Sequence, residues 1–130
     1  MIQTLLLLSG ISFFGSCTLD QQPQSKLFIV AVDSVNHPPS LSVGDTLTLR
    51  FYGTIGTSAC YAFSHFDTKR DGNIITITVW GKYTPADVCA TVMIELKGME
   101  YKISTLEKGN YTINIRQPDG SYLQRSVRVE

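Results

Sequence analysis

The chain has 130 residues, and its 11 basic residues balance 11 acidic ones. This length suits one domain with a single core. The balanced charge argues against nucleic-acid binding, which requires an excess of Lys and Arg to neutralise phosphates, and no block of like charges indicates an interaction tail.

The N-terminal segment is an uncharged, mostly apolar run over residues 2–16 that ends in small residues just before Cys17. One alternative is an uncleaved transmembrane anchor, but a spanning helix needs about 20 apolar residues and this run is shorter. Another is a buried N-terminal strand, which would require a run of leucines with no turn partner to join a sheet that is already complete. We therefore expect a signal peptide that is cleaved before Cys17.

The end of this run resembles the lipobox of bacterial lipoproteins, an apolar residue and two small residues before the lipidated cysteine, here Phe14, Gly15, Ser16 and Cys17. The resemblance implies that residues 1–16 are removed and that Cys17 carries a diacylglyceryl anchor, with acyl chains such as palmitate. It also implies a location at the outer membrane or cell surface of a Gram-negative bacterium. Residues 17–25 would be the lipidated N-terminus and tether, which leaves residues 26–130 as the domain.

After the tether, apolar residues recur with period two, which predicts β-strands. Residues 46–53 alternate most clearly, so one face of that strand is expected to be buried. Asp71 and Gly72 predict one hairpin, and residues 118–120 predict another. The expected strands are residues 26–34, 46–53, 59–68, 73–83, 90–96, 101–104, 110–117 and 121–129.

Residues 84–89 fit two interpretations. Thr84, Pro85 and Asp87 form a plausible helix start, with a capping side chain, a first-turn proline and an acid. The β-branched residues that follow favour a strand instead. We expect one helical turn at most, followed by a strand from Ala90 to Leu96.

Seven or eight short strands with turns between them and no long helix predict an all-β sandwich of two antiparallel sheets. Leu106, Gly109 and Tyr111, followed by an alternating strand, resemble the tyrosine corner of immunoglobulin-like domains. Residues 43–47 are also similar to a segment of bacterial immunoglobulin-like modules. The resemblance implies an immunoglobulin-like sandwich in which the Tyr111 hydroxyl bonds the backbone a few residues upstream.

Lipidation of Cys17 would leave Cys60 and Cys89 as an even pair in an oxidising compartment, so we expect a structural disulfide between them. The alternatives are free buried thiols, or thiols used for metal binding or nucleophilic chemistry. Such chemistry would need a histidine or an acid nearby. His37 lies in a proline-rich loop, and His65 is expected on the opposite strand face.

No motif indicates an enzyme, a cofactor or a metal site. His65 and Asp67 are expected to share a strand face while Ser64 points the other way, so a catalytic triad is not predicted. Asp67 and Asp71 have the spacing of calcium-loop ligands, but Lys69 occupies a position that needs an acid or an amide. The hairpin accounts for this segment.

Aromatic residues form the candidate binding surface. If the isoleucines and valine before it face the core, Trp80 lies on the outer face of its strand, while Tyr61 and Phe63 share a face of the neighbouring strand. Exposed aromatic rings on a sheet face stack on sugars or anchor a protein partner. The alternative is that Trp80 packs against a neighbouring aromatic residue and belongs to the core.

We therefore expect a lipid-anchored, extracytoplasmic and non-catalytic binding or assembly module whose ligand is a protein or a glycan. The membrane is its expected partner, contacted through the lipid on Cys17. A protease inhibitor is the alternative, and residues 35–44 or 54–59 would have to present its inhibitory loop. An enzyme whose residues come together only in the fold is less favoured.

Overall fold

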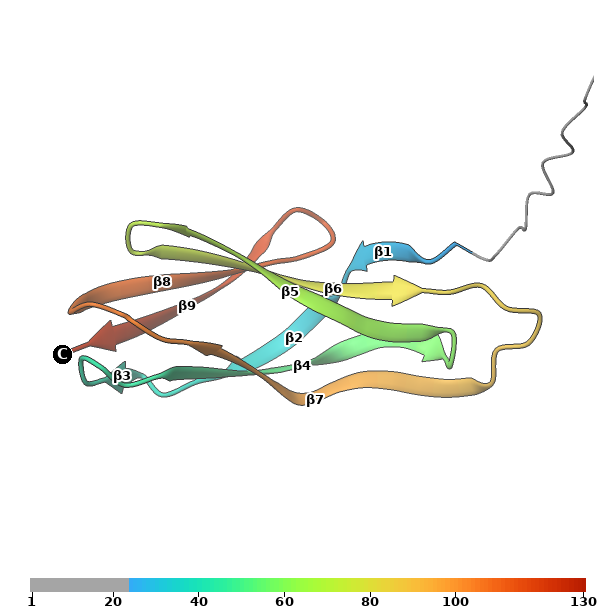
Figure 1. Cartoon of the computed structure of the whole chain (residues 1–130), viewed down its shortest axis with the longest axis horizontal. Helices are drawn as coiled ribbons and strands as arrows, with labels where there is room; N and C mark the ends of the chain where they lie inside the picture. The colour runs from blue at the N-terminus through green and yellow to red at the C-terminus, as the bar shows by residue number, and fades with distance from the viewer. Residues whose placement is uncertain (1–23) are drawn as a thin grey trace, which may run out of the picture.

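A computed structural model describes residues 24–130 of the chain (Figure 1). All regular structure in this part is β-strand, with nine strands in place of the seven or eight expected. The predicted signal peptide, Cys17 and most of the tether lie outside the described residues. The strands are β1 (Lys26–Ile29), β2 (Ala31–Asn36), β3 (Ser40–Leu41), β4 (Leu47–Ser58), β5 (Tyr61–Asp71), β6 (Ile74–Tyr83), β7 (Thr91–Ile103), β8 (Gly109–Arg116) and β9 (Tyr122–Val129).

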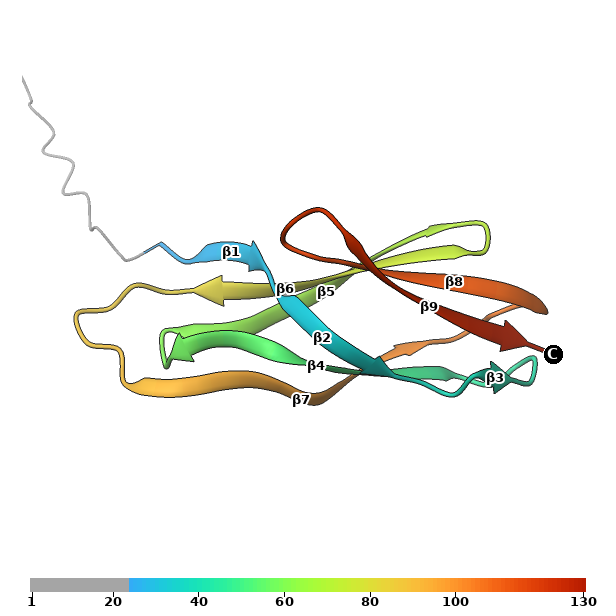
Figure 2. The same cartoon turned by 180° about the vertical axis from the view of Figure 1, so that it is seen from behind.

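The strands form two sheets that pack face to face (Figures 1 and 2). Sheet A contains β1, β3, β5, β6, β8 and β9, whereas sheet B has the order β2-β4-β7. In sheet A, β6 lies between β5 on one side and β1 and β8 on the other, and β9 links β8 to β3. The predicted all-β, two-sheet sandwich is therefore confirmed.

Two strand pairings are parallel, although only antiparallel pairing was expected. β6 pairs with β8 in parallel, and so does β3 with β9. Parallel neighbours need a long crossover connection, and here the chain crosses to sheet B as β7 between β6 and β8. A pattern of alternating residues marks each strand but does not specify which strand lies beside it.

The expected strand over residues 26–34 is two strands, because the chain changes sheets at Val30. Val30 is buried, and its N–H donates to the carbonyl of Val79 in sheet A at 2.8 Å. β2 then pairs with β4 in sheet B. The side-chain amide of Gln117 holds the crossing, since it donates to the Val32 carbonyl at 2.8 Å and accepts from the Val32 N–H at 3.0 Å.

The two strands expected over residues 90–96 and 101–104 are one continuous strand, β7. Gly98 is an extra residue in its pairing with β4 and has a φ of 75°, a conformation that glycine adopts without steric cost. Residues 84–90 form no helical turn, which agrees with the expectation of one turn at most, and this segment is tied to the turn between β4 and β5. Two backbone bonds hold it there, Thr84 N–H to Cys60 O and Ala59 N–H to Ala90 O, both 2.9 Å.

Residues 54–58 belong to β4, although residues 54–59 were predicted as a loop that could present an inhibitory sequence. Two glycines in this strand allow close packing. A Cβ at Gly56 would collide with the ring of Tyr61, and one at Gly53 would collide with the carbonyl of Ala31. Ile55 between them is buried, as the alternation of β4 requires.

The core lies between the two sheets and follows the period-two pattern. The inward residues of β4 begin with Leu47, Leu49 and Phe51, each 0% exposed. The predicted inward face of β6 is confirmed as well, with buried Ile75, Ile77 and Val79. β8 and β9 contribute further core residues of sheet A, Tyr111, Ile113, Ile115, Val127 and Val129.

Both predicted hairpins are present. In the first, Asp71 pairs with Ile74, so the two central turn residues are Gly72 and Asn73, one residue later than the predicted pair. In the second, the carboxylate of Asp119 accepts bonds from the N–H of Ser121 at 2.9 Å and from its hydroxyl at 2.6 Å. The Ser121 hydroxyl and N–H hold the pKa of Asp119 below its usual value, so the ionised carboxylate favours this turn.

Candidate binding face of sheet A

A bulge in β5 decides which of its side chains face outward. Phe63 pairs with Gly81, but the next pair is His65 with Trp80, so Ser64 is an extra residue. The bulge shifts the alternation by one residue. Phe63 therefore packs against the core beside Phe66, with ring centroids 5.1 Å apart, while His65 is exposed.

The three aromatic residues predicted as a binding surface are not brought together. Tyr61 and Phe63 both pack against the core. The Tyr61 ring contacts the rings of Phe28 and Tyr83, with centroid distances of 5.8 and 4.8 Å. Trp80 is half-buried and stacks on His65, with ring centroids 6.2 Å apart and an interplanar angle of 18°. The aromatic feature of the outer face is therefore the pair His65 and Trp80.

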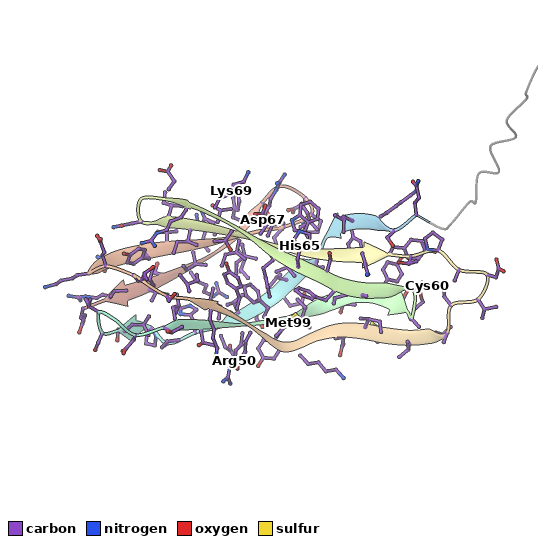
Figure 3. The ribbon with its side chains drawn as sticks, in the orientation of Figure 1. Arg50, Cys60, His65, Asp67, Lys69 and Met99 are labelled. Atoms are coloured by element: carbon purple, nitrogen blue, oxygen red, sulfur yellow. A yellow bond between two sulfur atoms is a disulfide. The ribbon has the colours of Figure 1, made fainter. Side chains whose placement is uncertain are left out.

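A groove lies next to this pair on the outer face of sheet A. It has a volume of about 210 Å³ and draws its lining from four neighbouring strands of the sheet. Figure 3 shows the β5 residues His65, Asp67 and Lys69 in succession along this face, with Arg50 on the opposite side of the molecule. The lining residues are Asp67, Lys69, Thr76, Thr78, Arg116 and Tyr122. We call this set the outer groove.

The charged side chains that line the outer groove are unpaired among the described residues, whereas its Thr78 is buried. Within residues 24–130, Asp67, Lys69 and Arg116 have no ion-pair partner within 4.0 Å. Tyr122 is 51% exposed and offers a ring. Beside the groove, Asn114 pairs with Thr76 across the sheet, and its Oδ1 is buried without a hydrogen-bond partner. The face therefore combines accessible rings with unused donors and acceptors.

A comparison with known protein families identifies the family of this domain. The family model described as the ORF11 beta-sandwich domain matches residues 52–129, more than half of the chain. The chain belongs to this family. No curated protein and no solved structure matches it. The residues matched to the ORF11 beta-sandwich domain include the whole outer groove, His65, Trp80 and both predicted disulfide cysteines.

The bulge also brings together two side chains that were expected on opposite faces. The Ser64 hydroxyl and His65 Nδ1 lie 2.8 Å apart in a hydrogen bond, because the extra residue turns both outward. Among the described residues, the His65 ring has no hydrogen bond to a carboxylate. The pair therefore lacks the acid that orients the histidine of a catalytic triad.

Residues 24–130 of this ORF11 beta-sandwich domain protein contain no group of three or more His, Cys, Asp or Glu side chains placed to hold a metal ion. They also contain no long apolar helix of the kind that crosses a bilayer.

The tyrosine-corner residues lie together at the start of β8. Leu106 and Tyr111 are buried, and the Tyr111 hydroxyl donates to the carbonyl of Glu107 at 2.8 Å, four residues upstream as the motif implies. The guanidinium of Arg70 lies over the Tyr111 ring, 5.5 Å from its centroid. Gly109, the remaining residue of the motif, begins β8.

Replacing Tyr111 with phenylalanine is expected to lower the free energy of unfolding by about 1 kcal/mol, because a buried hydroxyl loses its bond and leaves the Glu107 carbonyl unpaired. Urea denaturation measures the change. Tyr122→Phe is the matched control, since that ring is half-exposed, and should stay within about 0.5 kcal/mol of the parent. Equal losses in both variants would show that the corner bond contributes nothing.

The predicted disulfide between Cys60 and Cys89 is confirmed, with Cα atoms 5.5 Å apart. It joins the turn between β4 and β5 to residues 84–90, the irregular segment between β6 and β7. The bond excludes the alternatives of free thiols and thiol chemistry for this pair. Its place at one end of the sandwich, away from the outer groove, indicates a structural role.

Proposed function

We propose that this protein is a lipid-anchored, extracytoplasmic and non-catalytic binding module, and that it binds a glycan through the outer face of sheet A. A protein ligand is the second candidate for the same face. The observation that supports the proposal is the outer groove, which has unpaired polar side chains next to the stacked rings of His65 and Trp80.

The chemistry of this face suits a sugar better than a large apolar partner. Sugars offer C–H faces that pack on aromatic rings, and hydroxyl groups that bond to carboxylates, guanidinium groups and hydroxyls. The groove supplies the ring of Tyr122, with Asp67 and Arg116 as bonding groups, and the ring of Trp80 lies beside it.

The lipid anchor is supported by the sequence before Cys17, which ends in the order of a lipobox. Replacing Cys17 with alanine in a Gram-negative host is expected to move the protein from the membrane fraction to the soluble periplasm, because the acylated side chain is lost. Fractionation and immunoblotting measure this. A Cys17→Ala variant that stays with the membranes as the parent does would overturn the anchor.

The binding proposal is tested with the same soluble Cys17→Ala protein on an array of bacterial and host glycans. In this background, Trp80→Ala and Arg116→Ala are each expected to lower the affinity for the bound glycan by about tenfold, equivalent to about 1.4 kcal/mol of binding free energy. Arg50→Ala is the matched control, because this exposed arginine lies on the outer face of sheet B and pairs with Glu100 at 3.2 Å.

Three results would count against glycan binding at this face. Equal effects of the Arg116→Ala and Arg50→Ala variants would mean that the ligand binds elsewhere. Binding that survives Trp80→Ala would remove the stacking role of that ring. An array without any glycan ligand, together with capture of a protein whose binding depends on Arg116, would favour the protein ligand.

A further inference from the structure

One end of the sandwich exposes a concentration of apolar side chains. Of the seven large hydrophobic residues that are exposed in the described part of the chain, four lie at the end where the chain enters β1 and where β7 begins. Val88 is 85% exposed, the most of all. We call Leu27, Val88, Val92 and Met93 the apolar end.

The segment that carries Val88 is firmly held although it has no regular structure. The disulfide fixes Cys89 next to it, and the bonds of Thr84 N–H to Cys60 O and Ala59 N–H to Ala90 O fix both ends of the segment. Asp87 is its only charged residue. Val88 therefore points into solvent from a restrained, mostly apolar loop and does not fold back onto the core.

The chain enters the domain at this same end. The Ser25 hydroxyl bonds to the Thr84 hydroxyl at 2.7 Å, which pins the entry point against the start of the Val88 loop. Cys17 is eight residues before Ser25. Eight residues span at most about 29 Å even when fully extended, so a lipid on Cys17 keeps this end close to the bilayer.

We infer that the apolar end rests against the lipid surface to which Cys17 anchors the domain, with Val88 in the headgroup region. This inference rests on the proposed lipid anchor. Exposed apolar side chains with basic residues beside them suit the boundary between headgroups and acyl chains. Lys26 and Lys82, at the neighbouring ends of β1 and β6, supply those basic groups.

Contact between the apolar end and the bilayer orients the whole module. Glu130 lies at the opposite end of the sandwich from the apolar end (Figures 1 and 2), so that end projects away from the bilayer. The outer groove lies on the long side of the sandwich, where Figure 3 shows Asp67 and Lys69, and not at the apolar end.

The test uses the lipidated protein, residues 17–130, in vesicles of phosphatidylethanolamine and phosphatidylglycerol that contain a doxyl-labelled quencher lipid. Trp80→Phe removes the single native tryptophan. Val88→Trp then places one indole at the apolar end, and Val43→Trp places one on a matched exposed valine, 57% exposed, in the turn before β4. The indole at position 88 is expected to be blue-shifted and quenched severalfold more strongly than the indole at position 43.

Equal quenching at the two positions would overturn the inference while leaving the anchor in place. A blue-shifted indole at position 88 that the lipid quencher does not reach would also overturn it, because a protein surface would then cover the end. Flotation of the vesicles and the mass of the N-terminal peptide separate the two proposals. A protein that does not float and lacks the diacylglyceryl mass would overturn the anchor, and this inference with it.

Discussion

Replacing both Cys60 and Cys89 with alanine is expected to lower the free energy of unfolding by about 3–4 kcal/mol. The disulfide spans a sequence separation of 29, and a loop of that length restricts the unfolded chain by about this amount in the chain-entropy model. Urea denaturation in a Cys17→Ala background, which contains no other thiol, measures the loss from the shift of the midpoint.

The same variants should show where the bond acts. Hydrogen exchange at the amide of Ala59 is expected to accelerate more than the global loss requires, because that amide bonds to Ala90 in the segment that the disulfide holds. Reducing the parent with dithiothreitol should reproduce both effects. A double variant that unfolds at the parent's urea midpoint would show that hydrogen bonds and packing alone hold this end of the sandwich.

Much of the fold follows from the sequence because burial in a sandwich has period two. Leu47, Leu49 and Phe51 are all fully buried, as their alternation with polar residues predicts. Trp80 lies on the outer face for the same reason, since Ile77 and Val79 face the core. The hairpins also follow, because their turn residues act locally.

The parts that the sequence did not predict depend on contacts between distant segments. Val30 lies inside the unbroken apolar run of residues 27–32, so nothing in the pattern marks it as the point where the chain changes sheets. Gly56 resembles a loop residue but provides room for the ring of Tyr61. The parallel pairing of β6 with β8 is likewise set by the path of β7 through the other sheet.

The composition of the candidate site depends on a strand pairing that the sequence pattern does not reveal. Alternation alone places Tyr61, Phe63 and His65 on one face of β5, whereas the bulge at Ser64 sends the first two toward the core and leaves His65 outside. The outer groove could not be predicted either. Its lining comes from β5, β6, β8 and β9, and the neighbours of β6 become known only with the sheet order.

Replacing Phe51 with alanine is expected to cost about 3–5 kcal/mol of folding stability, the largest effect of any variant considered. Phe51 is 0% exposed and packs on Phe66 of the other sheet, with ring centroids 5.1 Å apart. Truncation opens a cavity between the sheets that the surrounding strands cannot fill. Urea denaturation measures the loss, and Ile74→Ala, at a 46% exposed position, should change stability by less than about 1 kcal/mol.

A double-mutant cycle between Phe51 and Phe66 shows how much of this loss belongs to the pair of rings. Aromatic pairs in such contact couple by about 0.5–1.5 kcal/mol beyond the area they bury. A coupling of this size would mean that the two sheets are held together partly by specific ring packing. Additive losses would contradict that, and would leave burial of apolar area as the sole contribution of Phe51 to the contact between the sheets.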